Sequence, residues 1–432
     1  MICDNLGVTA AGELTFAGRT ARELLEKYGS PLYVMDEARI RHNFKQYVDT
    51  MREVFGENAK VLYASKACAF KEMYRLAHQC GAGIDVVSAG EMYTAYTAGV
   101  PMDTVYFHGN SKTDAEIQLA LELGVGYFVV DHREEVDAIE QAAANAGKTA
   151  KVLLRITPGI DTHTYEAIAT GQVDSKFGSA IETGQAAALT AHTLQQPHVT
   201  LKGFHCHVGS QVFDSDTFFR SADIMLAFIA HIRDTLGYTA EQLDLGGGYG
   251  VRYTDADPEI DIADNIRQVG AHVFAACEKL GLPVPEMHLE PGRSIVADAG
   301  ITLYTVGSVK RIPGYKNYVS VDGGMGDNPR FALYGAEYTV VCPEKMHETA
   351  DFVCDVVGKY CESGDILQPN VTLPASVQRG DIVAVLTTGA YNYSMASNYN
   401  RVPRLPVIML TADGEKVVVK RETLDDIIRN DI

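Results

Sequence analysis

Between about residues 36 and 300, short apolar runs alternate with longer amphipathic segments, and this rhythm constrains the fold more than any other feature. The runs are rich in Val, Ile, Tyr and Phe, which favour β-strands. We expect about eight strands, at 60–64, 83–87, 104–107, 126–130, 150–156, 201–205, 242–245 and 286–289. The intervening segments, such as 113–123, 133–146 and 218–236, predict helices.

About eight strand–helix units over this length predict an α/β fold, a (β/α)8 barrel of the TIM type. A doubly wound open sheet is the structural alternative. After about residue 300 the pattern predicts a β-rich region, with strands at 301–310, 318–322, 337–341, 382–386, 407–410 and 416–419. N-terminal runs at 14–16 and 32–34 are also expected to join it. We therefore expect a barrel domain at 36–300 and a β-rich domain formed by 1–35 and 301–432.

Composition narrows the classes of partner. The formal charge is -19 and the pI near 5.1, which argues against nucleic acid or an anionic membrane surface, because both require a basic face. The eight cysteines form no CxxC pair, which is typical of reduced thiols in a cytoplasmic protein. No apolar stretch approaches the ~18 residues of a membrane span, and we expect no signal peptide.

Polar residues follow the predicted strands, and the carboxyl ends of barrel strands hold the active site. Lys66 follows the first strand, where partial burial would lower its pKa and free its amine for imine chemistry. A solvated lysine at a helix start is the alternative. Asp85 ends the second strand, and we expect it to face a cofactor.

Strand six supplies two histidines that point the same way, His205 and His207. They are compatible with a metal or with an imidazole lying flat against a cofactor ring, and His205 is also compatible with a core position. No third ligand follows at a persuasive spacing, so we expect no metal. Gly246 to Gly248 follow strand seven and can form a phosphate cradle or a plain turn.

Strand eight ends in Glu290 and Arg293, which form either a structural pair or a polar set that faces the pocket. The carboxylate could keep a pyridinium nitrogen protonated, which strengthens the ring as an electron sink. The β-rich region adds Arg330 with Tyr334, the adjacent Cys361 and Glu362, and the aromatic and polar stretch 389–400. A surface arginine, a half-buried cysteine and a plain loop are their respective alternatives.

Seven motifs in this order are similar to those of a known family: YASKA, HGN, HCHVGSQ, LGGG, EPGR, CESGD and GAY…SMASNYN. The chain resembles the diaminopimelate decarboxylases, pyridoxal-phosphate enzymes with the alanine-racemase-like fold, from about residue 30 to 410. EPGR and GGG alone would indicate only the wider group, which includes ornithine and arginine decarboxylases. CESGD and SMASNYN indicate the diaminopimelate branch.

The resemblance implies roles for particular residues. Lys66 resembles the Schiff-base lysine, and Cys361 resembles a proton donor that reaches in from the other subunit of a homodimer. The implied cofactor contacts are His207 on the ring, Glu290 on the pyridine nitrogen, Ser210, Gly246, Gly247, Gly248 and Gly292 around the phosphate, and also Arg293 and Tyr391. The implied substrate contacts are Arg293, Arg330, Tyr334 and Tyr391, with Glu362 on the distal amino group.

The resemblance predicts the decarboxylation of meso-2,6-diaminopimelate to L-lysine and carbon dioxide, the last step of lysine biosynthesis. The chain departs from the family where Phe331 follows Arg330, where Glu337 replaces an expected His, and where Lys359 and Tyr360 precede Cys361 without Pro. Two alternatives stay open: an ornithine-, arginine- or carboxynorspermidine-type decarboxylase, and a non-catalytic regulator with the same fold.

Overall fold

A computed structural model describes residues 2–159 and 175–432 of this protein. The backbone divides into two compact units. We call Asn43–Gly250 with Ile260–Gly292 the barrel unit. We call Met1–His42, Val251–Glu259 and Arg293–Ile432 the β-rich unit.

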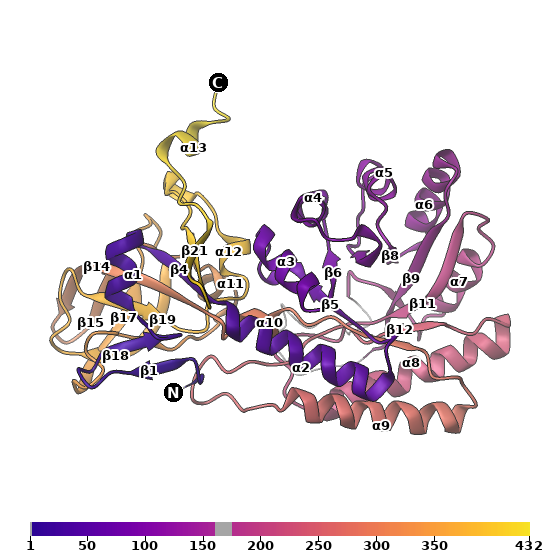
Figure 1. Ribbon diagram of the computed structural model, residues 1–432, viewed down its shortest axis with the longest axis horizontal. Coiled ribbons are helices and arrows are strands. Elements are labelled where there is room, and N and C mark those ends of the chain that lie inside the picture. The colour runs from indigo at the N-terminus through magenta and orange to yellow at the C-terminus, as the bar shows by residue number, and fades with distance from the viewer. Residues whose placement is uncertain (1, 160–174) are drawn as a thin grey trace. The chain divides into compact units, whose positions relative to one another are not determined.

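The barrel unit is built on a parallel sheet that closes on itself (Figure 1). In spatial order the ring contains β5 (Lys60–Ala64), β6 (Gly83–Val86), β7 (Val105–Phe107), β8 (Tyr127–Val130), β9 (Ala150–Thr157), β11 (Val199–His205), β12 (Gln242–Asp244) and β13 (Glu286–Leu289). Pairing of β13 with β5 and of β8 with β9 completes the ring, and β10 (Ser179–Ala180) adds to β9. The predicted barrel is confirmed, and the open doubly wound sheet is excluded.

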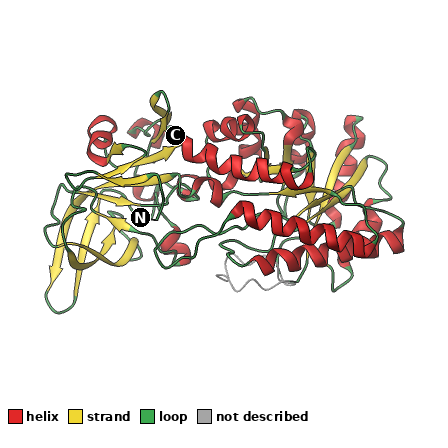
Figure 2. Ribbon diagram, turned by 60° about the horizontal axis from the view of Figure 1, so that its bottom comes forward, coloured by secondary structure: helices red, strands yellow, loops and turns green. Residues whose placement is uncertain are grey.

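Helices follow the barrel strands along the chain. Figure 2 draws the helices in red and the strands in yellow. The helices are α2 (Glu37–Phe55), which enters from the β-rich unit, and then α3 (Lys71–Gln79), α4 (Ala89–Ala98), α5 (Asp114–Leu123), α6 (Arg133–Ala146), α7 (Gln185–Thr193), α8 (Ser215–Leu236) and α9 (Ile262–Leu280). Thr113 forms a capping box at the start of α5, so this helix begins where the sequence predicted a helix at 113–123. Leu62, Tyr106, Val129 and Leu153 pack together from strands β5, β7, β8 and β9 of the ring.

The β-rich unit contains a sheet in which strands from both ends of the chain alternate. Its order is β18 (Ile366–Pro374), β17 (Ala350–Val357), β15 (Lys316–Val321), β14 (Gly300–Ile312), β4 (Leu32–Asp36), β20 (Val407–Thr411) and β21 (Gly414–Val419). β19 (Ile382–Val385) pairs with β14 and with β16 (Val340–Val341). The N-terminal strand β4 lies between β14 and β20, as predicted for a unit that the N-terminal segment joins.

Other N-terminal residues form a small separate sheet of β1 (Leu6–Val8), β2 (Leu14–Phe16) and β3 (Arg19–Thr20), followed by α1 (Ala21–Tyr28). Thr20 and Glu23 form a capping box at the start of α1. Leu14, Phe16 and Leu24 are buried in the same apolar core as strands β4, β14, β19 and β20. This shared core explains why the N-terminal segment belongs to the β-rich unit.

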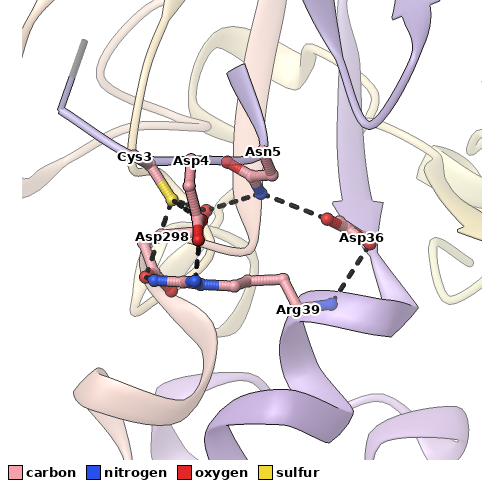
Figure 3. Close-up of polar contacts among 6 residues, drawn as sticks. All are labelled: Cys3, Asp4, Asn5, Asp36, Arg39 and Asp298. Carbon is pink, nitrogen blue, oxygen red and sulfur yellow. Dashed lines mark hydrogen bonds and ion pairs between the residues drawn. The ribbon is translucent and has the colours of Figure 1, made fainter. Parts of the chain in front are cut away.

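Hydrogen bonds and ion pairs join the N-terminal residues to other segments of this unit (Figure 3). Arg39 donates to Asp298 Oδ2 from Nε at 2.9 Å and from Nη2 at 2.6 Å, and its Nη1 lies 2.8 Å from Asp4 Oδ1. Asn5 Nδ2 donates to Asp36 Oδ2 and to the Asp298 carbonyl, each at 3.2 Å. These contacts therefore join three segments that are distant in the sequence.

All eight cysteines are free thiols. Among residues 2–159 and 175–432, no helix has the length and apolar character needed to span a membrane.

Candidate active site

Glu290 follows β13 at the carboxyl end of the barrel and is the residue around which the buried charges of this end gather. Its Oε1 lies 2.8 Å from Nε2 of His108, the residue that follows β7. Its Oε2 lies 3.0 Å from Nε2 of His205, the last residue of β11. All three side chains are buried. Asp85, at the end of β6, lies 3.8 Å from His108 Nε2. Four strand ends thus contribute to one acid–imidazole cluster.

The cluster separates the pKa values of its carboxyl groups. Burial alone would raise the pKa of Glu290, but the charges and hydrogen bonds of His108 and His205 outweigh it and hold this pKa well below its usual range. Burial raises the pKa of Asp85 to about 6, against the attraction of His108. Burial, followed by repulsion from Glu290, raises the pKa of Asp244 well above its usual range. Glu290 therefore keeps its negative charge to a lower pH than Asp85 or Asp244.

Lys66 lies in the short 3-10 turn η1 (Ser65–Ala67) directly after β5. Its side chain is exposed, so the partial burial that we expected after a buried strand is not found. The charge of Lys66 still acts here. It partly offsets the rise that burial causes in the pKa values of Asp85 and Glu91. β5 and β13 also approach closely at their ends, since a Cβ at Gly292 would lie 2.9 Å from Ala64 Cβ.

His207 and the glycine turn pack against each other. The Gly247 N–H donates to His207 Nδ1 at 3.3 Å, which leaves the ring proton of a neutral imidazole on Nε2. Burial, with the nearby cations Lys66 and Arg155, lowers the pKa of His207 well below its usual range. His207 is therefore a neutral ring at neutral pH.

Gly246 to Gly248 have no room for side chains. A Cβ at Gly247 would lie 2.1 Å from the Glu290 carbonyl oxygen, and one at Gly248 would lie 2.4 Å from the Gly209 carbonyl oxygen. The segment that contains Gly209 and the half-buried Ser210 therefore lies directly against this turn. The Gly246 N–H donates to Asp244 Oδ1 at 2.7 Å. The phosphate role of these glycines stays a prediction.

These groups offer a chemistry that fits pyridoxal phosphate. The fit consists of an anionic carboxylate for the ring nitrogen, a neutral flat imidazole for the ring face and an exposed amine for the aldehyde. Ligand atoms of His108, His205 and Glu290 also lie within 4.8 Å of one another, which is close enough for the three groups to hold a metal ion. Both imidazoles lie at hydrogen-bond distance from the Glu290 carboxylate. The carboxylate oxygens have further lone pairs, so they can also accept a hydrogen bond from the ring N–H of the cofactor.

The β-rich unit holds a second set of expected residues. Arg293 opens α10 (Arg293–Val296) and Arg330 opens α11 (Arg330–Tyr334); both are buried, so the surface-arginine alternative for Arg330 is wrong. The Tyr391 ring centroid lies 4.9 Å from Arg293 Cζ and 5.7 Å from Arg330 Cζ. Tyr391 has a φ of 68°, a strained conformation for a residue with a Cβ. Tyr334 is half-buried at the end of α11.

Two further tyrosines complete this arginine set, and the sequence did not single them out. Arg293 Nη1 donates to Tyr253 Oη at 2.8 Å, and Arg330 Nη1 donates to Tyr338 Oη at 2.6 Å. Tyr253 comes shortly after the glycine turn and Tyr338 comes eight residues after Arg330, so each lies near a motif. His108 was also missed as a site residue, although it begins the HGN motif at a strand end.

Cys361 and Glu362 are exposed in a loop that the buried Asp365 stabilises through hydrogen bonds to backbone N–H groups. The Asp365 carboxylate accepts from the Met325 N–H at 2.6 Å and from the Tyr360 N–H at 2.8 Å. Tyr360, which directly precedes Cys361, is buried. The Cys361 N–H donates to the Asn400 side chain at 2.8 Å. The loop conformation is thus set by the buried Asp365 and the exposed Asn400, and the side chains of Cys361 and Glu362 are exposed.

Comparison with known proteins identifies the family. Residues 37–297 match the pyridoxal-dependent decarboxylases, pyridoxal binding domain. The chain is 44% identical to the diaminopimelate decarboxylase of Bacillus subtilis, over 98% of this chain and 95% of that protein. The Staphylococcus aureus enzyme is 42% identical, over 97% and 98%.

Solved structures agree with this relation. The diaminopimelate decarboxylase of M. jannaschii, in complex with L-lysine, has a TM-score of 0.91 and 33% identity, and the match covers 99% of this chain and 98% of that one. Its fold, the barrel and the β-rich unit, is the fold described above. The chain therefore belongs to the pyridoxal-dependent decarboxylases, and within them to the diaminopimelate decarboxylase family.

Proposed function

We infer that this chain catalyses the pyridoxal-phosphate-dependent decarboxylation of meso-2,6-diaminopimelate to L-lysine and carbon dioxide, the last step of lysine biosynthesis. The observation that carries the choice of substrate is Arg330, a buried cation that forms no ion pair with a carboxylate of the described residues. Buried charges normally have a partner, and a substrate with a carboxylate at each end brings one. The named relatives support the same reaction.

Residues of the barrel unit would hold the cofactor. Pyridoxal phosphate, when bound, supplies the electron sink for the electron pair that departing carbon dioxide leaves behind. Glu290 stays anionic and would hold a proton on the ring nitrogen, while the neutral His207 would lie against the ring face. Lys66 would provide the amine for covalent attachment. The remaining contacts that we propose are Asp85, Ser210, Gly246, Gly247, Gly248 and Gly292.

Residues of the β-rich unit would hold the far end of the substrate. Arg293 and Arg330 can bind a carboxylate through planar, bidentate hydrogen bonds, and the exposed Glu362 can accept the distal amino group. Tyr334 and Tyr391 would add contacts. An ornithine-type substrate has no distal carboxylate and would leave Arg330 without an anion, so the structure favours diaminopimelate.

Cys361 would deliver a proton to the substrate's α-carbon. We propose that it does so across a homodimer, with Cys361 of the partner subunit completing each site, and that the protein is cytoplasmic, where its free thiols persist. We also propose residues 36–300 as the cofactor-binding domain and 1–35 with 301–432 as its companion.

A panel of substrates tests the reaction. Purified holoenzyme is offered meso-diaminopimelate, L-lysine, L-ornithine and L-arginine in parallel, and released carbon dioxide is measured. Release from diaminopimelate alone is expected. Equal release from ornithine or arginine would favour the broader decarboxylase, and no release from any of them would favour a non-catalytic regulator.

Lys66→Ala tests the covalent attachment, with the exposed Lys71→Ala as a matched control. Borohydride should fix the cofactor to the wild type and to Lys71→Ala but not to Lys66→Ala. Full fixation to Lys66→Ala would remove Lys66 from this role. Glu362→Gln should raise KM for diaminopimelate, and unchanged kinetics would remove Glu362 from the substrate site.

A further inference from the structure

Tyr253 lies between the two buried arginines of the β-rich unit. It belongs to the short stretch Val251–Glu259 and is buried. Its hydroxyl accepts a hydrogen bond from Arg293 Nη1 at 2.8 Å. Arg330 Cζ lies 5.0 Å from the centroid of its ring, and Arg293 Cζ lies 5.8 Å from it. One phenol therefore contacts both guanidinium groups.

Arg330 is enclosed mainly by aromatic rings. Its Cζ lies 5.5 Å from the ring of Tyr338, whose hydroxyl accepts from Nη1 at 2.6 Å, and 5.7 Å from the ring of Tyr391. Tyr253 and Tyr338 meet edge to face, with ring centroids 5.2 Å apart. Such cation–π contacts attract a cation but do not neutralise it, so Arg330 keeps its positive charge within this aromatic enclosure.

The two cations in turn change the phenol. Burial would raise the pKa of Tyr253, but the charges of Arg293 and Arg330 outweigh burial and lower it. The hydroxyl oxygen accepts from Arg293 Nη1 and so orients this guanidinium group before any ligand arrives. Donors held in place beforehand cost less ordering entropy when the ligand binds.

We propose that Tyr253 is a positioning residue for the distal carboxylate of the substrate. Its ring spaces Arg293 and Arg330, and its hydroxyl holds the Arg293 guanidinium in the orientation that binds a carboxylate. This proposal rests on the proposed function, since that function supplies the carboxylate. Tyr253 is a specificity determinant because a diamine without this carboxylate gains nothing from the orientation.

Tyr253→Phe tests the proposal, because it keeps the ring and removes the hydroxyl. KM for diaminopimelate should rise about 10-fold, the usual effect of losing one hydrogen bond to a charged group, while kcat changes less than about twofold. Tyr315→Phe, on the exposed turn between β14 and β15, is the matched control and should leave both constants unchanged. A fall in kcat with an unchanged KM would overturn the proposal.

Binding of two related amines separates orientation from general damage. L-Lysine keeps the distal carboxylate, and cadaverine is lysine without it. By calorimetry, Tyr253→Phe should weaken lysine binding about 10-fold and leave cadaverine binding unchanged. Equal weakening of both would overturn the proposal. This comparison does not require turnover, so a wild type that releases no carbon dioxide would defeat the proposed function and leave the role of Tyr253 testable.

A third measurement follows the phenol itself. Ultraviolet absorbance should detect one tyrosine of the 22 that ionises below the ordinary tyrosine range in the wild type and is missing in Tyr253→Phe. L-Lysine should shift this ionisation to higher pH, because its carboxylate neutralises the arginines, and cadaverine should not. Identical titrations of the two proteins would overturn the proposal even if the variant folds poorly.

Discussion

At the scale of single residues, Glu290 is the buried carboxylate of the barrel unit that two buried histidines contact. We predict that Glu290→Gln destabilises the cofactor-free protein by about 3 kcal/mol at pH 7, because it removes the anion that two buried histidines contact. The free energy of unfolding in urea measures this loss. Glu278→Gln, on the exposed face of α9, is the control and should have little effect.

The loss should depend on pH. A folded pKa below the unfolded value of 4.5 stabilises the protein above about pH 4.5, and this contribution disappears as the pH falls through the folded pKa. The gap between wild type and Glu290→Gln should therefore shrink in acid. A gap that does not shrink as the pH falls below 4.5 would mean that the charge of Glu290 does not stabilise the fold.

Asp327 in the β-rich unit should behave in the opposite sense. Tyr304 donates a hydrogen bond to Oδ1 and the Gly324 N–H donates to Oδ2 at 3.0 Å, yet burial dominates and raises the pKa of Asp327 to about 7. The folded protein thus holds the proton more tightly than the unfolded chain. Its stability should fall between about pH 4 and pH 7, by up to about 4 kcal/mol.

Asp327→Asn should remove this slope, since an amide does not titrate. Urea unfolding at intervals between pH 4 and pH 7 measures the difference between the slopes of the two proteins. Asp413→Asn, in the exposed turn between β20 and β21, should keep the wild-type slope. Parallel slopes for wild type and Asp327→Asn would contradict the raised pKa.

Individual residues also show what sequence reasoning can and cannot reach in the site. The strand-end rule brought Asp85 and Glu290 to one edge of the barrel, because that edge follows from topology alone. It did not predict that His108 and His205 would share one carboxylate. Such contacts depend on side-chain directions in strands that are far apart in the chain. The phenol between two arginines was missed for the same reason.

At the scale of elements, Gly203 permits the pairing of β11 with β12. It pairs with Gln242, and a Cβ at Gly203 would lie 1.8 Å from the Gln242 carbonyl oxygen. We predict that Gly203→Ala pushes these strands apart and destabilises the barrel by several kcal/mol, of the order of ~3 or more for overpacking a ladder. The midpoint of thermal unfolding measures it.

Gly90→Ala is the matched control for that substitution. Gly90 lies in α4, is exposed, and has only the Ser88 hydroxyl within 4 Å of an added Cβ, at 3.7 Å. Alanine is the better helix former by about 1 kcal/mol, so this variant should be more stable than wild type. Two glycine-to-alanine changes of equal effect would mean that the space at β11–β12 does not matter.

Continuously buried strands of the β-rich unit were predicted well, and so was β21, whose residues are half-buried or exposed. All five residues of β4 and all four of β19 are buried, and both strands were predicted close to their observed limits. β17 and β18 were missed because exposed and buried residues are mixed along them. Their pairing with each other depends on partners that the local pattern does not contain.

At the scale of the whole molecule, the proposed homodimer makes a quantitative prediction. Lys66→Ala and Cys361→Ala should each be inactive, but unfolding and refolding them together should restore activity. Random pairing makes half of the dimers mixed, and each mixed dimer has one site with both residues intact. Carbon dioxide release should therefore reach about a quarter of the wild-type rate.

No recovery on mixing, although both variants refold to dimers, would place Lys66 and Cys361 in the same chain. Mixing Lys66→Ala with a second preparation of itself is the control for refolding and should give no activity. The family relation identifies the cofactor and the reaction, but it leaves this assembly to experiment.

The interleaved sheet of the β-rich unit has a consequence for how the protein is made. β4 leaves the ribosome early, yet its neighbours β14 and β20 begin only at residues 300 and 407. A strand whose five residues are all buried in the folded protein must therefore wait unpaired while the whole barrel is synthesised, and contacts this distant in sequence form slowly. Nascent chains of this protein should depend on chaperones until the last strands emerge.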